Sequence, residues 1–151
     1  MTQEEKELLY KDLCMRLPYK PKCACIWKKL APNRTKGYIS TLSTFLLEQF
    51  EGMEEYEDIP INNLKPYLRP LSSMSDKERE EWTDLFMTPI IELEEHYEED
   101  DVEEVTAPQM FTKSHCKSIN WLLERHFDIN GLIEKDLAIE VTEENNPYAS
   151  N

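Results

Sequence analysis

Thiol and imidazole groups are the side chains in this sequence best suited to bind a metal. Cys23, Cys25, His115 and Cys116 supply ligands of the kind that hold zinc tetrahedrally. A structural zinc site usually contains cysteine pairs separated by two residues, and the chain has no such pair. We therefore expect no metal, and we expect Cys14, Cys23 and Cys116 to pack as small core residues.

A cysteine and a histidine could also act together in nucleophilic catalysis. Cys116 and His126 are ten residues apart, which separates them by about 15 Å along one helix, too far for a hydrogen bond. His126 is better explained as the end of that helix, where a cationic imidazole would meet the negative end of the helix dipole. Glycine-rich phosphate loops, paired metal-binding histidines and nucleophile-elbow serines are missing from the sequence. These features favour a protein that is not an enzyme and needs no cofactor.

Carboxylates are concentrated in one run. Nine of the thirteen residues from Glu92 to Glu104 are acidic. The run has no glycine and does not follow the ligand order of an EF-hand loop, so a calcium site is not expected. Repulsion between so many like charges predicts a solvated helix end and a mobile loop near 97–108. We interpret the run as a surface for another protein with a basic surface, and its residues are Glu94, Glu95, Glu98, Glu99, Asp100, Asp101, Glu103 and Glu104.

Cations gather at the start of a chain whose net charge is −14. Residues 1–36 contain nine Lys and Arg against four Asp and Glu. Cations interleaved with aromatic rings are typical of single-stranded nucleic-acid surfaces, where cations follow phosphates and rings stack on bases. The net charge argues against nucleic acid as a general partner, and an acidic protein surface could meet the same cations. The residues of this alternative surface are Lys20, Lys22, Trp27, Lys28, Lys29, Arg34 and Lys36.

Capping boxes mark the starts of two predicted helices. In this motif a Ser or Thr hydroxyl and a Glu carboxylate three residues on satisfy free backbone N–H groups. The pairs are Thr2 with Glu5 and Ser75 with Glu78, and the helices they begin are predicted over 3–17 and 76–96. Pro89 predicts a kink or break in the second of these helices. Helical spacing of apolar residues predicts a third helix over 113–126.

Strands are predicted where apolar residues alternate. Residues 22–28 and 137–141 show this alternation, and a short strand is predicted to end toward Ile61, with Pro60 confining it to a sheet edge. Residues 38–50 fit a helix by their apolar spacing and strands by their Ser and Thr content, so both interpretations stay open. Residues 145–151 have the polar composition of a loose tail.

Three stretches of the sequence resemble a family of small uncharacterised proteins common in gut Bacteroidetes and in their phages and mobile elements. They cover about half of the chain, and no activity comes with the resemblance. The stretches are Leu8–Tyr19, Leu64–Met74 with its Lys-Pro-Tyr-Leu-Arg-Pro core, and Trp121–Tyr148 with its His-Phe-Asp and Gly-Leu-Ile cores. Members of this family carry a β-meander between the first two stretches, so the resemblance implies strands in 38–50. It also implies a bacterial or phage origin.

Length, composition and resemblance together predict the fold class. At 151 residues with 40% apolar composition, the chain suits a single domain over residues 1–144. We expect an α+β fold with an N-terminal helix, a small antiparallel β-meander, two further helices and a short C-terminal strand. No apolar run approaches the ~20 residues of a membrane span, so we expect a cytoplasmic protein with no membrane partner. The acidic run from Glu92 to Glu104 could also imitate nucleic acid and occupy a basic site on a host protein.

Overall fold

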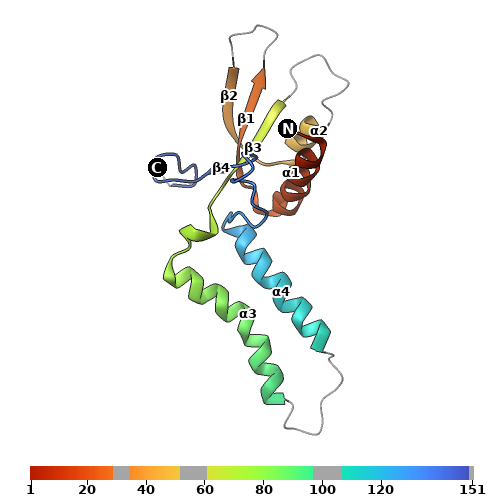
Figure 1. The fold of residues 1–151 in the computed structure, drawn as a ribbon, viewed down its shortest axis with the longest axis vertical. Helices are drawn as coiled ribbons and strands as arrows, with labels where there is room; N and C mark the ends of the chain where they lie inside the picture. Colours follow the sequence, from red (N-terminus) through yellow and green to blue (C-terminus); the bar gives the residue numbers. More distant parts are fainter. Residues whose placement is uncertain (29–34, 52–60, 97–106, 150–151) are drawn as a thin grey trace.

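The computed structural model describes residues 1–28, 35–51, 61–96 and 107–149, and the side chains of residues 1–25, 37–48, 64–85, 87 and 115–149. Helices and one four-stranded sheet make up the fold, so the predicted α+β class is confirmed (Figure 1). In chain order the elements are α1 Gln3–Arg16, a 3-10 turn Leu17–Tyr19, β1 Lys22–Lys28, β2 Thr35–Thr41, α2 Thr44–Glu51, β3 Ile61–Leu68, a 3-10 turn Leu71–Ser73, α3 Asp76–His96, α4 Ala107–Glu124 and β4 Ile139–Glu140.

The first helix begins at its predicted capping box. The Thr2 hydroxyl accepts the Glu5 N–H at 3.2 Å, and the Glu5 carboxylate accepts the Thr2 N–H at 2.7 Å. Leu9 and Leu13 on its inner face are fully buried, as expected from their spacing. Two charged residues of α1 are also fully buried, which the apolar pattern does not predict.

The strands are arranged in the order β2-β1-β3-β4. β1 pairs antiparallel with both β2 and β3, and β4 pairs parallel to β3. The sheet is therefore mixed, and the expected meander order is wrong because β1 lies at its centre. The edge strand predicted to end toward Ile61 falls on residues 52–60, which lie outside the described residues. β3 begins at Ile61, extends to Leu68 and lies between β1 and β4.

One face of the sheet packs against the helices. Cys23 and Cys25 of β1 and Leu64 of β3 are fully buried on this face and join Leu9 and Leu13 of α1 in the main core cluster. Figure 1 shows α1 and α2 together on one side of the sheet. Cysteine suits this position because a small apolar side chain lets the helix approach the strand closely.

Both interpretations of residues 38–50 are correct, each for one half. Residues up to Thr41 continue β2 and pair with β1, whereas α2 begins at Thr44. The Ser43 hydroxyl accepts the Leu46 N–H at 3.4 Å and caps this short helix. Leu46 and Leu47 are buried in the main core cluster, which explains the helical spacing in the second half.

Two long helices form an antiparallel hairpin that extends away from the sheet (Figure 1). We call α3, α4 and the segment joining them, residues 76–124, the arm. α3 continues through Pro89, so the predicted break is wrong. α4 begins at Ala107, earlier than the predicted residue 113, and the rest of the predicted loop lies outside the described residues. Across the described ranges, no helix has both the length and the apolar character needed to span a bilayer.

The C-terminal residues are better ordered than a loose tail. The Tyr148 hydroxyl accepts the Lys22 N–H at 3.0 Å and donates to the Tyr67 carbonyl at 2.9 Å. The Tyr148 ring stacks on His126 with 4.3 Å between the ring centroids. Tyr148 thus bridges Lys22 of β1 and Tyr67 of β3, next to the position where Cys23 faces Pro66. Pro66 has no N–H and cannot donate a hydrogen bond to β1 there.

Candidate functional site

Most of the negative charge of the protein lies on the arm. Residues 76–124 contain fifteen Asp and Glu against four Lys and Arg, a net charge of −11 out of −14. At 1.5 Å per residue, the 21 residues of α3 and the 18 of α4 span about 31 Å and 27 Å. Within the arm, α3 carries eight Asp and Glu against two Lys and Arg and extends away from the sheet (Figure 1). α4 carries one Glu against two Lys, and the other six carboxylates lie outside the described residues.

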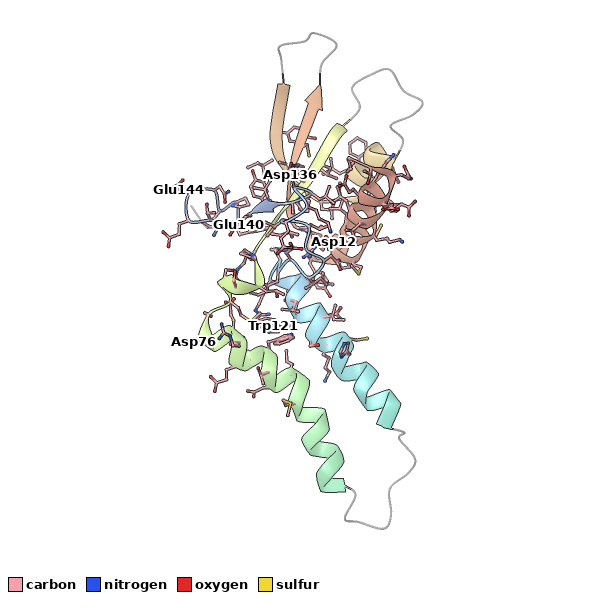
Figure 2. All side chains as sticks on the ribbon, viewed as in Figure 1. Asp12, Asp76, Trp121, Asp136, Glu140 and Glu144 are labelled. Carbon is pink, nitrogen blue, oxygen red and sulfur yellow. The ribbon has the colours of Figure 1, made fainter. Side chains whose placement is uncertain are left out.

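Four of the six carboxylates whose side chains are described on the arm are exposed to solvent. Asp76, Glu80, Asp84 and Glu124 are exposed, and Glu81 is half-buried beside Arg125, with 3.5 Å between its carboxylate and the guanidinium. Figure 2 shows Asp76 at the base of α3. Of the predicted interaction residues, Glu94 and Glu95 belong to the last turn of α3, although their side chains lie outside the described set. The residues Glu98, Glu99, Asp100, Asp101, Glu103 and Glu104 lie outside the described part of the chain.

Aromatic rings and arginines hold the base of the arm. Trp121 of α4 stacks on Phe127 with 6.1 Å between centroids, and Arg69 lies 4.3 Å from the centroid of the Phe127 ring. Arg125 lies 4.0 Å from the centroid of the Trp121 ring. Phe127 also forms a parallel bridge with Arg69, which ties the end of the arm to the continuation of β3. These contacts fix the orientation of the base of the arm relative to β3.

A buried ion pair connects α1 to this base. Arg16 donates to both carboxylate oxygens of Asp12, at 2.6 and 3.1 Å, and to the Phe127 carbonyl at 2.8 Å. Asn130 donates to the same carboxylate at 2.8 Å, and Asp12 and Arg16 are both fully buried. Each charge is compensated, so this network has the composition of a structural brace rather than a catalytic centre.

Arg69 makes a second ion pair at the start of α3. It donates to both carboxylate oxygens of Glu78, at 2.7 and 3.0 Å. Hydrogen bonds from Arg69 and Ser75 lower the pKa of Glu78 from 4.5 to about 2, although partial burial acts in the opposite direction. The predicted capping box at Ser75 is confirmed, because the Glu78 N–H donates to the Ser75 hydroxyl at 3.2 Å. Arg69 therefore links the continuation of β3 to the first turn of α3.

His126 ends α4, but not as a cation. Burial, and then the positive charges of Arg16 and Arg69, lower the pKa of His126 from 6.5 to about 4, so the imidazole is neutral at pH 7. Its backbone is left-handed, with φ of 60°. The His126 N–H donates to the Leu123 carbonyl and the Phe127 N–H to the Leu122 carbonyl, which is the hydrogen-bond pattern of a Schellman cap. The expected interaction of a cation with the helix dipole is therefore wrong.

The sulfur ligands are not brought together with histidine. Cys23 and Cys25 are buried on β1, and burial raises the pKa of both thiols, which makes them poor nucleophiles. Cys116 and its neighbour His115 are exposed on α4, and Cys14 is exposed on α1, so the expectation that Cys14 and Cys116 lie in the core is wrong. In the ranges that are described, no three His, Cys, Asp or Glu side chains gather as a metal site.

The predicted basic surface belongs to the β1–β2 hairpin. Lys22 is half-buried, and its ammonium donates to the Thr41 hydroxyl at 2.8 Å, whereas Lys20 is exposed before β1. Trp27, Lys28 and Lys36 are strand residues whose side chains lie outside the described set, and Lys29 and Arg34 lie outside the described residues.

The residues that join distant parts of the chain are not evident in the sequence. Asp12 and Arg16 are four apart beside the apolar stripe of α1, and this spacing was the only local signal for a pair. Nothing in the sequence around Tyr148 indicates its contact with Lys22, 126 residues away.

Comparison with known proteins adds no relative, because no family model, no curated protein and no solved structure matches the chain.

Proposed function

We propose that this chain is a non-enzymatic interaction protein that binds a basic surface of another protein through its acidic arm. The observation that carries the proposal is the concentration of −11 of the −14 net charges on residues 76–124; −6 of them belong to α3, which extends away from the sheet (Figure 1). A field of one sign on a projecting element attracts an oppositely charged partner at long range and speeds their association.

The proposal includes a setting. Four free cysteines suit a reducing cytoplasm, and the resemblance described above suggests an accessory protein of a bacterium or phage. In its sharper form the arm imitates the phosphates of nucleic acid and occupies a nucleic-acid site on a basic protein. The eight carboxylates of α3 are spread over about 31 Å, the length of several base pairs, given about one phosphate per 1.7 Å of duplex.

Partner capture with two matched variants tests the proposal. The arm variant changes six carboxylates between α3 and α4 to amides: Glu98→Gln, Glu99→Gln, Asp100→Asn, Asp101→Asn, Glu103→Gln and Glu104→Gln. The control variant makes the same number of changes at exposed sites elsewhere: Glu4→Gln, Glu7→Gln, Glu134→Gln, Glu140→Gln, Glu143→Gln and Glu144→Gln. Both variants have a net charge of about −8, so general charge effects cancel between them.

The expected result is a basic protein that is captured by the wild-type chain and by the control variant but is lost from the arm variant. Short duplex DNA should release that protein if the arm imitates nucleic acid. Equal capture by both variants would overturn the role of the arm. A captured partner without a basic surface would overturn the proposed chemistry.

A further inference from the structure

The outer side of β2 is an open sheet edge. β2 is the first strand in the order β2-β1-β3-β4 and pairs with β1 over seven residues, from Thr35 to Thr41, without a register shift. No other strand in the described ranges pairs with it. An edge strand presents unpaired N–H and C=O groups, and protective features such as proline or a bulge are absent from β2.

Apolar side chains flank this edge on both faces of the sheet. Tyr38 is 42% exposed and Ile39 is 53% exposed. The register places Tyr38 opposite Cys25, on the face that packs against the helices, and Ile39 opposite Ala24, on the other face. A strand added beside β2 would therefore find an apolar neighbour for its side chains on each face.

The charge around β2 selects the kind of strand that can bind. The paired strands β1 and β2 contain Lys22, Lys28 and Lys36 and no Asp or Glu. The β1–β2 hairpin lies at the end of the molecule remote from the arm (Figure 1), so carboxylates of the arm do not neutralise it. A second β2 strand from another copy would bring like charges together, whereas an acidic strand would be attracted.

We propose that the outer edge of β2 binds an extended acidic segment of a partner protein as an added strand. In this mode of recognition the main-chain hydrogen bonds supply affinity, and the alternating side chains supply specificity. Carboxylates on one face of the segment would meet the cations of the hairpin, and apolar residues on its other face would pack beside either Tyr38 or Ile39, which lie on opposite faces of the sheet. This surface is distinct from the arm and does not depend on the function proposed for it.

The test is a titration of the isotope-labelled full chain, followed by NMR, with four probes. The first is a blocked heptapeptide that alternates glutamate and valine. The second replaces each glutamate with lysine, and the third keeps the glutamates but replaces each valine with proline, which cannot donate to a ladder. The fourth is oligothymidylate. Two variants of equal charge accompany them, Lys36→Glu in β2 and Lys117→Glu at an exposed site on α4.

Only the glutamate–valine peptide is expected to shift the amide signals of Gly37 to Thr41 and slow their hydrogen exchange. Lys36→Glu should weaken this binding about threefold, as for an exposed charge pair, and Lys117→Glu should leave it unchanged. Equal shifts with the proline peptide would show charge attraction without strand pairing and would overturn the proposal. So would tighter binding of oligothymidylate at the same residues, self-association through β2, or no shift at all.

Discussion

At the scale of single residues, the feature that organises this protein is a buried ion pair at a crossing of distant segments. Arg16 at the end of α1 binds the carboxylate of Asp12 and the backbone carbonyl of Phe127, which is 111 residues away. Asn130 donates to the same carboxylate, whereas Arg16 Nη1 is buried with no hydrogen-bond partner among the described residues. A guanidinium has fixed planar geometry, so these bonds set both the position and the orientation of the arm base relative to α1.

Removing one partner of this pair should destabilise the fold strongly. Asp12→Ala leaves the Arg16 charge buried without its counterion, and we expect a loss of about 3–5 kcal/mol in the free energy of unfolding. Urea denaturation followed by circular dichroism measures it. The control is Lys77→Ala, which breaks an exposed pair of the same spacing with Glu81, at 3.9 Å, and should change stability by less than about 0.5 kcal/mol. Equal effects of the two changes would contradict the structural role of the buried pair.

The hydroxyl of Tyr148 should also contribute measurably. Tyr148→Phe keeps the ring stacked on His126 but removes the partner of the Lys22 N–H and the Tyr67 carbonyl. Leaving partly buried backbone groups unsatisfied costs about 1–3 kcal/mol. Tyr19→Phe, at another half-buried tyrosine, is the control and should be close to neutral. The same urea titration decides, and a neutral Tyr148→Phe would mean that the C-terminal residues do not hold β1 to β3.

His126 should make the protein sensitive to mild acid. The fold lowers its pKa from 6.5 to about 4, which means that the fold favours the neutral imidazole. The resulting stability is complete above pH 6.5 and is lost as the pH falls toward about 4. Glu78, with a pKa lowered from 4.5 to about 2, acts in the same direction only at lower pH.

Comparing stability at pH 7 and pH 4.5 therefore isolates the histidine. His126→Asn keeps a residue that accepts the left-handed backbone but cannot titrate, so this variant should lose less stability than the wild-type chain between the two pH values. If the two proteins lose stability in parallel, the neutral imidazole is not the cause.

At the scale of elements, the local signals of the sequence predicted α1, α3 and β1, but they did not predict β3 or the arrangement of the strands. The capping boxes at Thr2 and Ser75 and the alternation in β1 depend on neighbours within a few residues, and all three are confirmed. The order β2-β1-β3-β4 depends on pairings between segments far apart in the chain. The buried Asp12–Arg16 pair depends on a contact with Phe127 that no local pattern encodes.

Pro89 offers a test of α3 as a continuous helix. Proline in a helix interior removes one hydrogen bond and clashes with the preceding turn, at a cost of up to about 3 kcal/mol. Because α3 continues through this residue, Pro89→Ala should increase both helicity and stability. Pro108→Ala is the control, since Pro108 lies in the first turn of α4, where proline is tolerated. Thermal unfolding followed by circular dichroism at 222 nm measures both helicity and stability. If Pro89→Ala increased neither of them, a continuous α3 would be contradicted.

At the scale of the whole molecule, the separation of charge along the chain becomes a separation in space. The hairpin of β1 and β2, which lies within a stretch of 31 residues free of carboxylates, is at one end, and the arm with its net −11 extends from the other (Figure 1). The sequence predicted the asymmetry but not this geometry, because the position of the arm depends on the contacts at its base. Two surfaces of opposite sign suit a protein that joins a basic partner to an acidic one.

The most direct test of the central claim is the salt dependence of binding to the captured basic partner. The dissociation constants of the wild-type chain, the six-site arm variant and the six-site control variant are measured by calorimetry between 50 and 500 mM salt. Screening acts on interactions between exposed charges, so we predict a steep loss of affinity for the wild-type chain and the control variant, and a shallow one for the arm variant. If the affinities of all three proteins fell equally with salt, or if no affinity changed with salt, an interaction through the arm would be contradicted.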